Sequence, residues 1–140
     1  MTGKLADKVV LVTGGSGGIG LGIAKHLSEE GAREFITGRR PAELNKAVAS
    51  IGENVAAVQG AVSDPSDLNR IFAHIRSQVR RIDVLLANAG FYAFGTLGEI
   101  TKKHFDRTFN TNVRGLLFTV QKALPLLSQG SSLVLTGSTR

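Results

Sequence analysis

The chain has 140 residues, with 17 Lys or Arg against 11 Asp or Glu, and a formal net charge of +6. Hydrophobic residues make up 42% of it and there are only 3 prolines, which excludes a disordered chain or a collagen-like repeat and predicts one domain with a buried core. The absence of cysteine excludes disulfide frameworks, thiolate metal sites and cysteine nucleophiles, and we expect no metal site.

The basic residues do not form the pattern of a nucleic-acid-binding protein. They occur as scattered pairs, such as Arg39–Arg40 and Arg80–Arg81, interleaved with acids and without a helix-turn-helix, zinc-finger or aromatic RNA-reading motif. The first residues, MTGKLADK, contain no apolar stretch of signal-peptide length, and no later run approaches the roughly 20 apolar residues of a membrane span. We therefore expect no nucleic-acid partner, no membrane contact and a cytoplasmic location.

Short apolar runs rich in β-branched residues predict five strands. These runs are residues 9–12, 35–37, 55–58, 82–87 and 133–136. They are hydrophobic almost throughout, without the polar alternation of a sheet that has one face in water. This pattern is typical of a parallel sheet that is covered on both faces.

Segments with helical periodicity separate the predicted strands. The first begins at Ile19 and ends before Gly31, Pro41 opens the second, Pro65 opens the third, and the fourth is a long helix over about 101–127. Strand and helix alternate along the chain and end on a fifth strand. The sequence therefore predicts an α/β fold, a Rossmann-type doubly wound parallel sheet with helices on both faces.

A glycine-rich turn follows the first predicted strand and opens the first helix. It reads TGGSGGIG over residues 13–20. Gly14 suits the tight turn, Gly18 the close approach of backbone to a pyrophosphate, and Gly20 the close packing of helix against strand. Backbone N–H groups at a helix N-terminus attract an anion, so this placement predicts a dinucleotide-binding turn rather than a merely flexible one.

The same turn also matches the G-x-S-x-G nucleophile elbow of α/β-hydrolases, with Ser16 at its centre. A serine hydrolase needs a downstream acid and then a histidine, but His26, His74 and His104 all lie in predicted helices. No Gly-Lys-Ser/Thr follows the glycines, which excludes a P-loop. We interpret Ser16 as a phosphate or ribose contact, and a serine hydrolase remains a distant alternative.

Four short motifs, in order along the chain, carry a resemblance to a known family. Residues 13–20 match a Thr-Gly-x-x-x-Gly-x-Gly cofactor motif, and residues 87–90, Ala-Asn-Ala-Gly, match Asn-Asn-Ala-Gly except in the first place. Asn112 stands at the position of a tetrad asparagine and Ser138 at that of a catalytic serine. In these motifs the whole chain resembles the classical short-chain dehydrogenases/reductases.

The resemblance implies hydride transfer between a nicotinamide ring and the carbonyl or alcohol carbon of a small-molecule substrate. In that chemistry Ser138 would polarise the carbonyl and Asn112 would hold a proton-relay water, beside a tyrosine acid/base and a lysine that lowers its pKa. The one tyrosine, Tyr92, precedes the serine and is followed four residues later by Thr96. Without Tyr-x-x-x-Lys, we expect residues 1–140 to be a single NAD(P)-binding domain, truncated before the remaining strands of a longer one-domain enzyme and inactive alone.

The end of the second predicted strand favours NADP(H) over NAD(H). An NAD site needs a carboxylate here for the ribose 2′-hydroxyl, but the sequence has Arg39 and Arg40, and Arg39 can grip a 2′-phosphate with two hydrogen bonds. After the third strand Ala61 replaces the aspartate that is usual in the family, while Val62 can flank the adenine. We therefore expect an NADP(H) site that lacks one adenine contact.

These inferences define a predicted site and one main alternative. The predicted cofactor-binding residues are Gly14, Ser16, Gly17, Gly18, Ile19, Gly20, Arg39, Arg40, Val62, Asn88, Ala89 and Gly90. The alternative is a non-catalytic dinucleotide-binding module with a sensor or regulatory role. The resemblance also implies a homo-oligomer assembled through the long helix over 101–127.

Overall fold

A computed structural model describes residues 3–138 as one parallel sheet flanked by helices. The strands are β1 (Val9–Thr13), β2 (Arg33–Gly38), β3 (Val55–Gln59), β4 (Val84–Ala87) and β5 (Ser132–Leu135). The helices are α1 (Gly18–Glu29), α2 (Pro41–Ile51), α3 (Pro65–Gln78), α4 (Lys102–Phe109) and α5 (Leu116–Ala123), with a π-helical turn η1 (Asn110–Gly115) before α5 and a 3-10 turn η2 (Leu124–Leu126) after it. The strand order β3-β2-β1-β4-β5 confirms the predicted doubly wound, Rossmann-type sheet.

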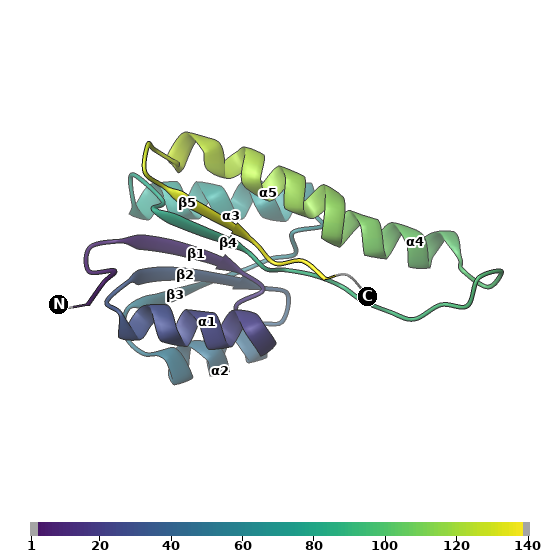
Figure 1. The fold of residues 1–140 in the computed structure, drawn as a ribbon, viewed down its shortest axis with the longest axis horizontal. Helices are drawn as coiled ribbons and strands as arrows, with labels where there is room; N and C mark the ends of the chain where they lie inside the picture. The colour runs from purple at the N-terminus through teal and green to yellow at the C-terminus, as the bar shows by residue number, and fades with distance from the viewer. Residues whose placement is uncertain (1–2, 139–140) are drawn as a thin grey trace.

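Helices cover both faces of the sheet, α1 and α2 on one face and α3 and α5 on the other (Figure 1). The helix starts follow local sequence signals, because α2 and α3 each have a proline in the first turn. At the start of α3 the Asp64 carboxylate accepts hydrogen bonds from Ser66 N at 2.8 Å and Asp67 N at 3.3 Å. Gly52, with φ of +124°, ends α2.

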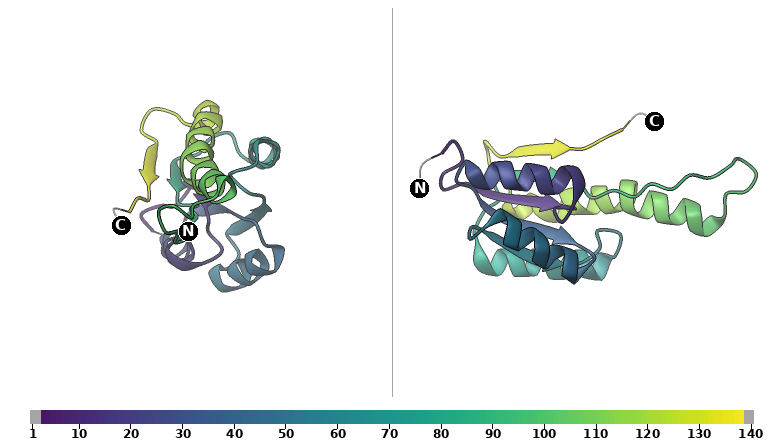
Figure 2. Two further views of the ribbon diagram at one scale, coloured as in Figure 1. Left: turned by 90° about the vertical axis from the view of Figure 1, so that its right-hand side faces the viewer. Right: turned by 90° about the horizontal axis from the view of Figure 1, so that it is seen from below.

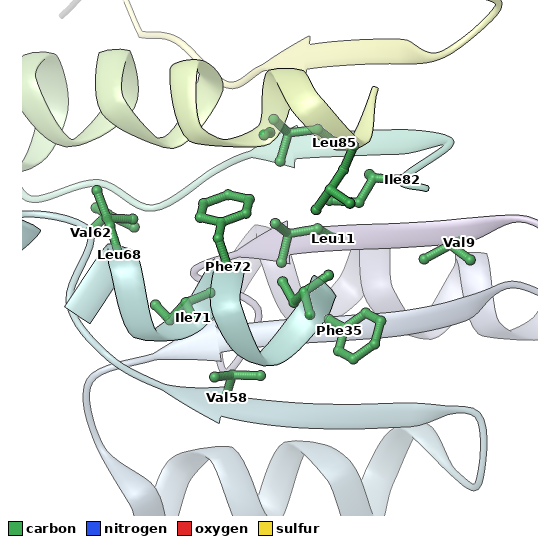
Figure 3. Packing of buried hydrophobic residues seen from close by; sticks show 13 residues of the cluster. Val9, Leu11, Phe35, Val58, Val62, Leu68, Ile71, Phe72, Ile82 and Leu85 are labelled. Carbon is green, nitrogen blue, oxygen red and sulfur yellow. The ribbon is translucent and has the colours of Figure 1, made fainter. Parts of the chain in front are cut away.

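Two apolar clusters form the core, one on each face of the sheet. On the α3 face, Leu11 of β1 and Phe35 of β2 belong to the same cluster as Phe72 of α3 (Figure 3). On the opposite face Val10 and Ile36 form part of the second cluster. Strands β1 to β4 each send side chains to both cores, which explains why these four predicted strands are apolar throughout.

All five predicted strands are found, but each has at least one boundary wrong by one or two residues. Strands β1 and β3 end one residue later than predicted, and β2 covers 33–38 rather than 35–37. Strand β4 begins at Val84 rather than at 82, because Ile82 N donates to Leu126 O at 2.8 Å and not to a neighbouring strand. Strand β5 covers 132–135 rather than 133–136. Ile82 is nevertheless fully buried, so its apolar character reports core packing and not strand pairing.

The long helix predicted over about 101–127 is present as an unbroken helical stretch, but its hydrogen-bond pattern changes along its length. The structure has α4, η1, α5 and η2 in succession, and the π-helical turn shifts the backbone hydrogen-bond register between α4 and α5. Thr101 Oγ1 caps α4 by accepting a hydrogen bond from His104 N at 3.1 Å. Figure 2 shows that α4 and the segment before it project beyond the carboxyl end of the sheet, whereas α5 covers the sheet.

Strand β5 and one side of α5 expose apolar side chains. Leu133, Val134 and Leu135 of this edge strand are 44%, 45% and 53% exposed. On the helical side Leu117 and Leu124 are exposed, although Phe118 and Val120 pack against the core. Between residues 3 and 138 no helix is long and apolar enough to span a membrane. The edge strand β5 and the outer side of α5 and η2 thus present apolar surface.

Candidate functional site

The glycine-rich turn leaves an open cradle at the carboxyl end of β1. Gly14 and Gly18 have φ of +66° and +53°, in the left-handed region that favours glycine. A Cβ on Gly17 or Gly18 would have no neighbouring protein atom within 4 Å, whereas a Cβ on Gly20 would overlap the carbonyl oxygen of Gly14. Gly17 and Gly18 therefore keep space open above the turn, and Gly20 allows α1 to pack against it.

A hydrogen-bond network joins this turn to the end of β4. Thr13 Oγ1 accepts hydrogen bonds from Asn88 N at 3.0 Å and from Ala89 N at 3.1 Å. In return, Asn88 Nδ2 donates to Gly14 O at 3.3 Å. The two predicted motifs are thus held side by side, as expected for the carboxyl ends of adjacent parallel strands.

A cleft of about 210 Å³ opens between these turns and the ends of β2 and β3. Its lining includes eight of the predicted cofactor residues: Gly14, Ser16, Gly17, Arg39, Arg40, Val62, Ala89 and Gly90. It also includes Thr37, Gly38, Gly60, Ala61, Ser63, Phe91 and Thr111, which the sequence did not single out as site residues. The cleft therefore draws on the segments after β1, β2, β3 and β4, and on η1.

The two arginines predicted to select NADP(H) are both exposed at the mouth of this cleft. Within residues 3–138 neither guanidinium forms an ion pair. The acid nearest along the chain is Glu43, whose Oε1 lies 3.8 Å from Lys46 Nζ. Gln59 Nε2 donates to Arg39 O at 3.0 Å and so ties this turn to the end of β3. The guanidinium groups remain available to a ligand.

The turn after β3 holds its shape with a carboxylate from α3. Ala61 N donates to Asp67 Oδ2 at 2.9 Å, and this hydrogen bond, together with Arg70, holds the pKa of the Asp67 carboxyl below its usual value despite partial burial. Val62 is buried beside it. The aspartate that the family resemblance leads us to expect at position 61 is replaced by alanine, and the Asp67 carboxylate bonds the backbone of that residue.

The π-helical turn η1 fastens the segments after β3 and β4 to one another. Asn112 Oδ1 accepts from Phe91 N at 2.8 Å, and Asn112 Nδ2 donates to Phe91 O at 2.7 Å. Arg114 Nη2 donates to Ser63 O at 2.7 Å. A Cβ on Gly115 would lie 2.9 Å from Val62 O, so glycine lets the helix approach this close.

The remaining predicted residues do not line the cleft. Gly18, Ile19 and Gly20 form the first turn of α1, with the Ile19 side chain 67% exposed. Ser138 is exposed three residues after the end of β5, and Asn112 binds the backbone of Phe91. The structure thus gathers eight of the twelve predicted cofactor residues at one cleft.

Sequence reasoning missed the roles of Thr13 and Phe91. Thr13 is the first residue of the glycine motif and is 3% exposed, so a buried hydroxyl at the end of an apolar strand was the available signal. Phe91 directly follows the Asn-Ala-Gly motif, and nothing in its own sequence context indicates the contact with Asn112.

The geometry gives no support to the hydrolase alternative. His26, His74 and His104 lie in α1, α3 and α4, and among residues 3–138 no histidine bonds the Ser16 hydroxyl. In the same range no group of three or more His, Cys, Asp or Glu residues is placed to hold a metal ion. Ser16 lies instead against Gly38, since a Cβ added to Gly38 would be 2.9 Å from Ser16 Oγ. Its hydroxyl thus borders the arginine turn.

Comparison with known proteins agrees with this arrangement. Residues 8–140 match the sequence model of a family described as short chain dehydrogenase. The oxidoreductase asL5 of Sarocladium schorii is 44% identical over 137 residues, covering 96% of this chain and 55% of that protein. Two reductases are also similar. Trihydroxynaphthalene reductase of Colletotrichum orbiculare is 32% identical, over 96% of this chain and 49% of that protein. Tetrahydroxynaphthalene reductase PfmaG of Pestalotiopsis fici is 35% identical, over 95% of this chain and 50% of that protein.

Solved structures give the same result. A short chain dehydrogenase from Burkholderia cenocepacia in complex with NADP superposes with a TM-score of 0.90 at 35% identity, covering 96% of this chain and 57% of that one. The chain thus spans about half the length of the relatives that it matches. From its motifs, its sheet and these similarities, the chain belongs to the short-chain dehydrogenase/reductase family.

Proposed function

We propose that this chain is the cofactor-binding part of an NADP(H)-dependent oxidoreductase that transfers a hydride between the nicotinamide ring and a carbonyl or alcohol carbon. One observation carries the proposal: the glycine cradle and two guanidinium groups that form no ion pair within residues 3–138 face the same cleft. The family membership supports the reaction class.

The cradle fits a pyrophosphate. Within the described chain, α1 has no side-chain cap and no acid in its first turn, so its N–H groups and the positive end of its dipole favour an anion. The open space at Gly17 and Gly18 admits the phosphate oxygens to the backbone. On the adenine side, Val62, Ala89 and Thr111 offer apolar contact.

The arginine turn fits a 2′-phosphate. Arg39 and Arg40 follow β2, where a carboxylate would repel that phosphate, and Ser16 lies at the same turn as a neutral hydrogen-bonding partner. A bidentate guanidinium–phosphate pair is worth about 1.5–3 kcal/mol, which corresponds to roughly tenfold or more in affinity. This magnitude is the basis for preferring NADP(H) to NAD(H).

For the chemical step, we assign Ser138 to hydrogen-bond and polarise the substrate carbonyl. The nicotinamide of the bound cofactor supplies or accepts the hydride. Asn112 bonds the Phe91 backbone with both ends of its amide, so we propose it as a residue that positions the segment after β4, with a relay water left to its second lone pair on Oδ1. Because Tyr-x-x-x-Lys is missing from residues 1–140, we propose that these residues alone do not turn over substrate.

The names of two relatives suggest a substrate class. Both are reductases of hydroxylated naphthalenes, which are flat, fused aromatic rings bearing phenolic oxygens. We propose a carbonyl substrate of this fused-ring phenolic class.

Two expectations from the sequence stay predictions. One is a homo-oligomer formed through α4 and α5, where Phe105, Phe109 and Leu117 are exposed. The other is a cytoplasmic location.

Titration of the full-length protein with NADPH and NADH tests the cofactor assignment. We expect the wild type to bind NADPH at least about tenfold more tightly than NADH. Arg39→Ala should lower the affinity for NADPH by about tenfold or more, while the affinity for NADH should change by less than about twofold. Lys46→Ala, which removes an exposed cation from α2 away from the cleft lining, is the matched control.

Equal affinities in the wild type, or a preference that survives Arg39→Ala, would contradict the assignment. Oxidation of NADPH with a ketone substrate separates an enzyme from the alternative of a non-catalytic module. Tight cofactor binding without any turnover by the full-length protein would favour the module.

A further inference from the structure

A second cavity, larger than the cofactor cleft, lies at the amino ends of the strands. It has a volume of about 680 Å³, and its lining includes Val9, Arg33 and Val55, the first residues of β1, β2 and β3. The strands run toward the end of the sheet from which α4 projects, so this cavity lies at the opposite end (Figure 1). Strand β1, with its five residues, spans about 16 Å and separates the cavity from the glycine cradle.

The end of α3 and a small side chain on β3 leave this space open. Helix α3 ends at Gln78, and the next residue, Val79, is extended with φ of −139° and ψ of 158°. Ala56 of β3 is aligned with Phe35 of β2 but is exposed, whereas the Phe35 ring is buried. Ala56 and Val79 give the cavity an apolar part of its lining.

Three guanidinium groups, those of Arg33, Arg80 and Arg81, also line the cavity. The fold uses the third, because Arg81 Nε donates to the two carboxylate oxygens of Asp83 at 3.0 and 3.1 Å and Arg81 Nη2 donates to Asp7 O at 2.8 Å. Within residues 3–138 neither Arg33 nor Arg80 forms an ion pair. These two cations are therefore available to a ligand.

The charges around the cavity favour an anion. The exposed carboxylates in its lining are those of Asp7 and Glu53, so the three guanidinium groups leave an excess of one positive charge among its exposed groups. The Arg33 guanidinium lies 5.8 Å from the centroid of the Phe35 ring, an attractive contact that restricts its position. A planar guanidinium bonds two oxygens of a phosphate at once, which makes arginine well suited to this ligand.

We propose that this cavity binds an organic phosphate, with Arg33 and Arg80 bonding the phosphate group and a small apolar part of the molecule lying against Ala56 and Val79. A phosphate monoester has three terminal oxygens and carries about 1.5–2 negative charges at neutral pH, so it can accept from both guanidinium groups. The site is separate from the cofactor cleft, and the proposal does not depend on the proposed function.

The experiment uses phenyl phosphate as the probe, with inorganic phosphate and phenol as its two separate parts. Binding to the full-length protein, with and without saturating NADP⁺, is followed by the NMR signals of the backbone amides. We expect phenyl phosphate to shift the signals of Arg33, Ala56 and Arg80, and to bind at least about threefold more tightly than inorganic phosphate or phenol. Arg33→Gln and Arg80→Gln should each lower its affinity by about fivefold or more, less than for a buried pair because both groups are exposed.

A matched control separates this site from general attraction by a basic protein. Arg76→Gln removes an exposed cation of α3 that does not line the cavity, and it should change the affinity by less than about twofold. The proposal is overturned if phenyl phosphate does not bind, if Arg76→Gln weakens binding as much as Arg80→Gln does, or if only signals of the cofactor cleft, such as those of Gly17 and Arg39, shift. A failure of NADP⁺ to bind would contradict the proposed function alone, because phenyl phosphate is also titrated without cofactor.

Discussion

Glu34 makes the stability of this protein depend on pH in an unusual direction. It is the second residue of β2, aligned with Val10 of β1 and Val55 of β3, and is 1% exposed. Within residues 3–138 neither of its carboxylate oxygens has a hydrogen-bond partner. Burial without a compensating partner raises the pKa of the Glu34 carboxyl from 4.5 to about 8.

The direction of the effect follows from which state binds the proton. Below about pH 4.5 the carboxyl is protonated in both states, and between this pH and about 8 the unfolded chain loses the proton while the folded protein keeps it. The free energy of unfolding therefore falls through this range. Each tenfold change in the proton-binding equilibrium changes the free energy of unfolding by about 1.4 kcal/mol. The pKa shift of Glu34 therefore lowers the free energy of unfolding by about 5 kcal/mol once the pH exceeds about 8.

Urea unfolding of the full-length protein at pH 5 and at pH 8 checks this value. Glu34→Gln removes the titrating group at nearly constant volume and should abolish most of the pH-dependent loss, so that the variant gains several kcal/mol relative to wild type between the two pH values. Glu53→Gln, at an exposed carboxyl before β3, is the matched control and should leave the loss in place. Parallel pH profiles for wild type and Glu34→Gln would refute the reasoning.

Three further predictions separate the cradle from the fold. Gly17 has φ of −162° and open space for a methyl group, so Gly17→Ala should leave the melting temperature within a few degrees of wild type. The same variant should weaken NADPH binding about tenfold or more, and unchanged binding would contradict the assignment of this turn to the pyrophosphate. Gly20→Ala, whose methyl would overlap Gly14 O, should lower the free energy of unfolding by about 1–3 kcal/mol, measured in urea. Thr13→Val leaves Asn88 N without its acceptor and should cost about 1–3 kcal/mol in the same assay, whereas a stable variant would mean that water replaces the hydroxyl.

Much of the fold could be predicted because the sheet is buried on both faces. Strands covered on both faces are mostly apolar, and short apolar runs bounded by turn residues mark strands to within one or two residues. The cleft was predictable for a related reason, since glycines and arginines at strand ends leave little freedom over where they can lie. Ile82 shows the limit, because burial and strand pairing leave the same apolar signal in a sequence.

Contacts between distant segments account for what the sequence did not predict. The apolar spacing that predicts a helix over 101–127 continues through η1, and it does not indicate that Asn112 bonds Phe91 or that Arg114 bonds Ser63. These partners are 21 and 51 residues away along the chain, beyond the range of helical periodicity. The same is true of Thr13, whose partners at the end of β4 lie 75 and 76 residues on.

The π-helical turn is therefore part of the site and not a defect in the helix. A regular helix repeats every 3.6 residues, whereas inserting one wider turn rotates α4 relative to α5. Because Gly115 carries no Cβ, η1 can approach the carbonyl of Val62, and the turn then reaches the segments after β3 and β4 together. Two hydrogen bonds from Asn112 of η1 hold Phe91, so a regular α-helix in place of η1 would leave one wall of the cleft unsupported.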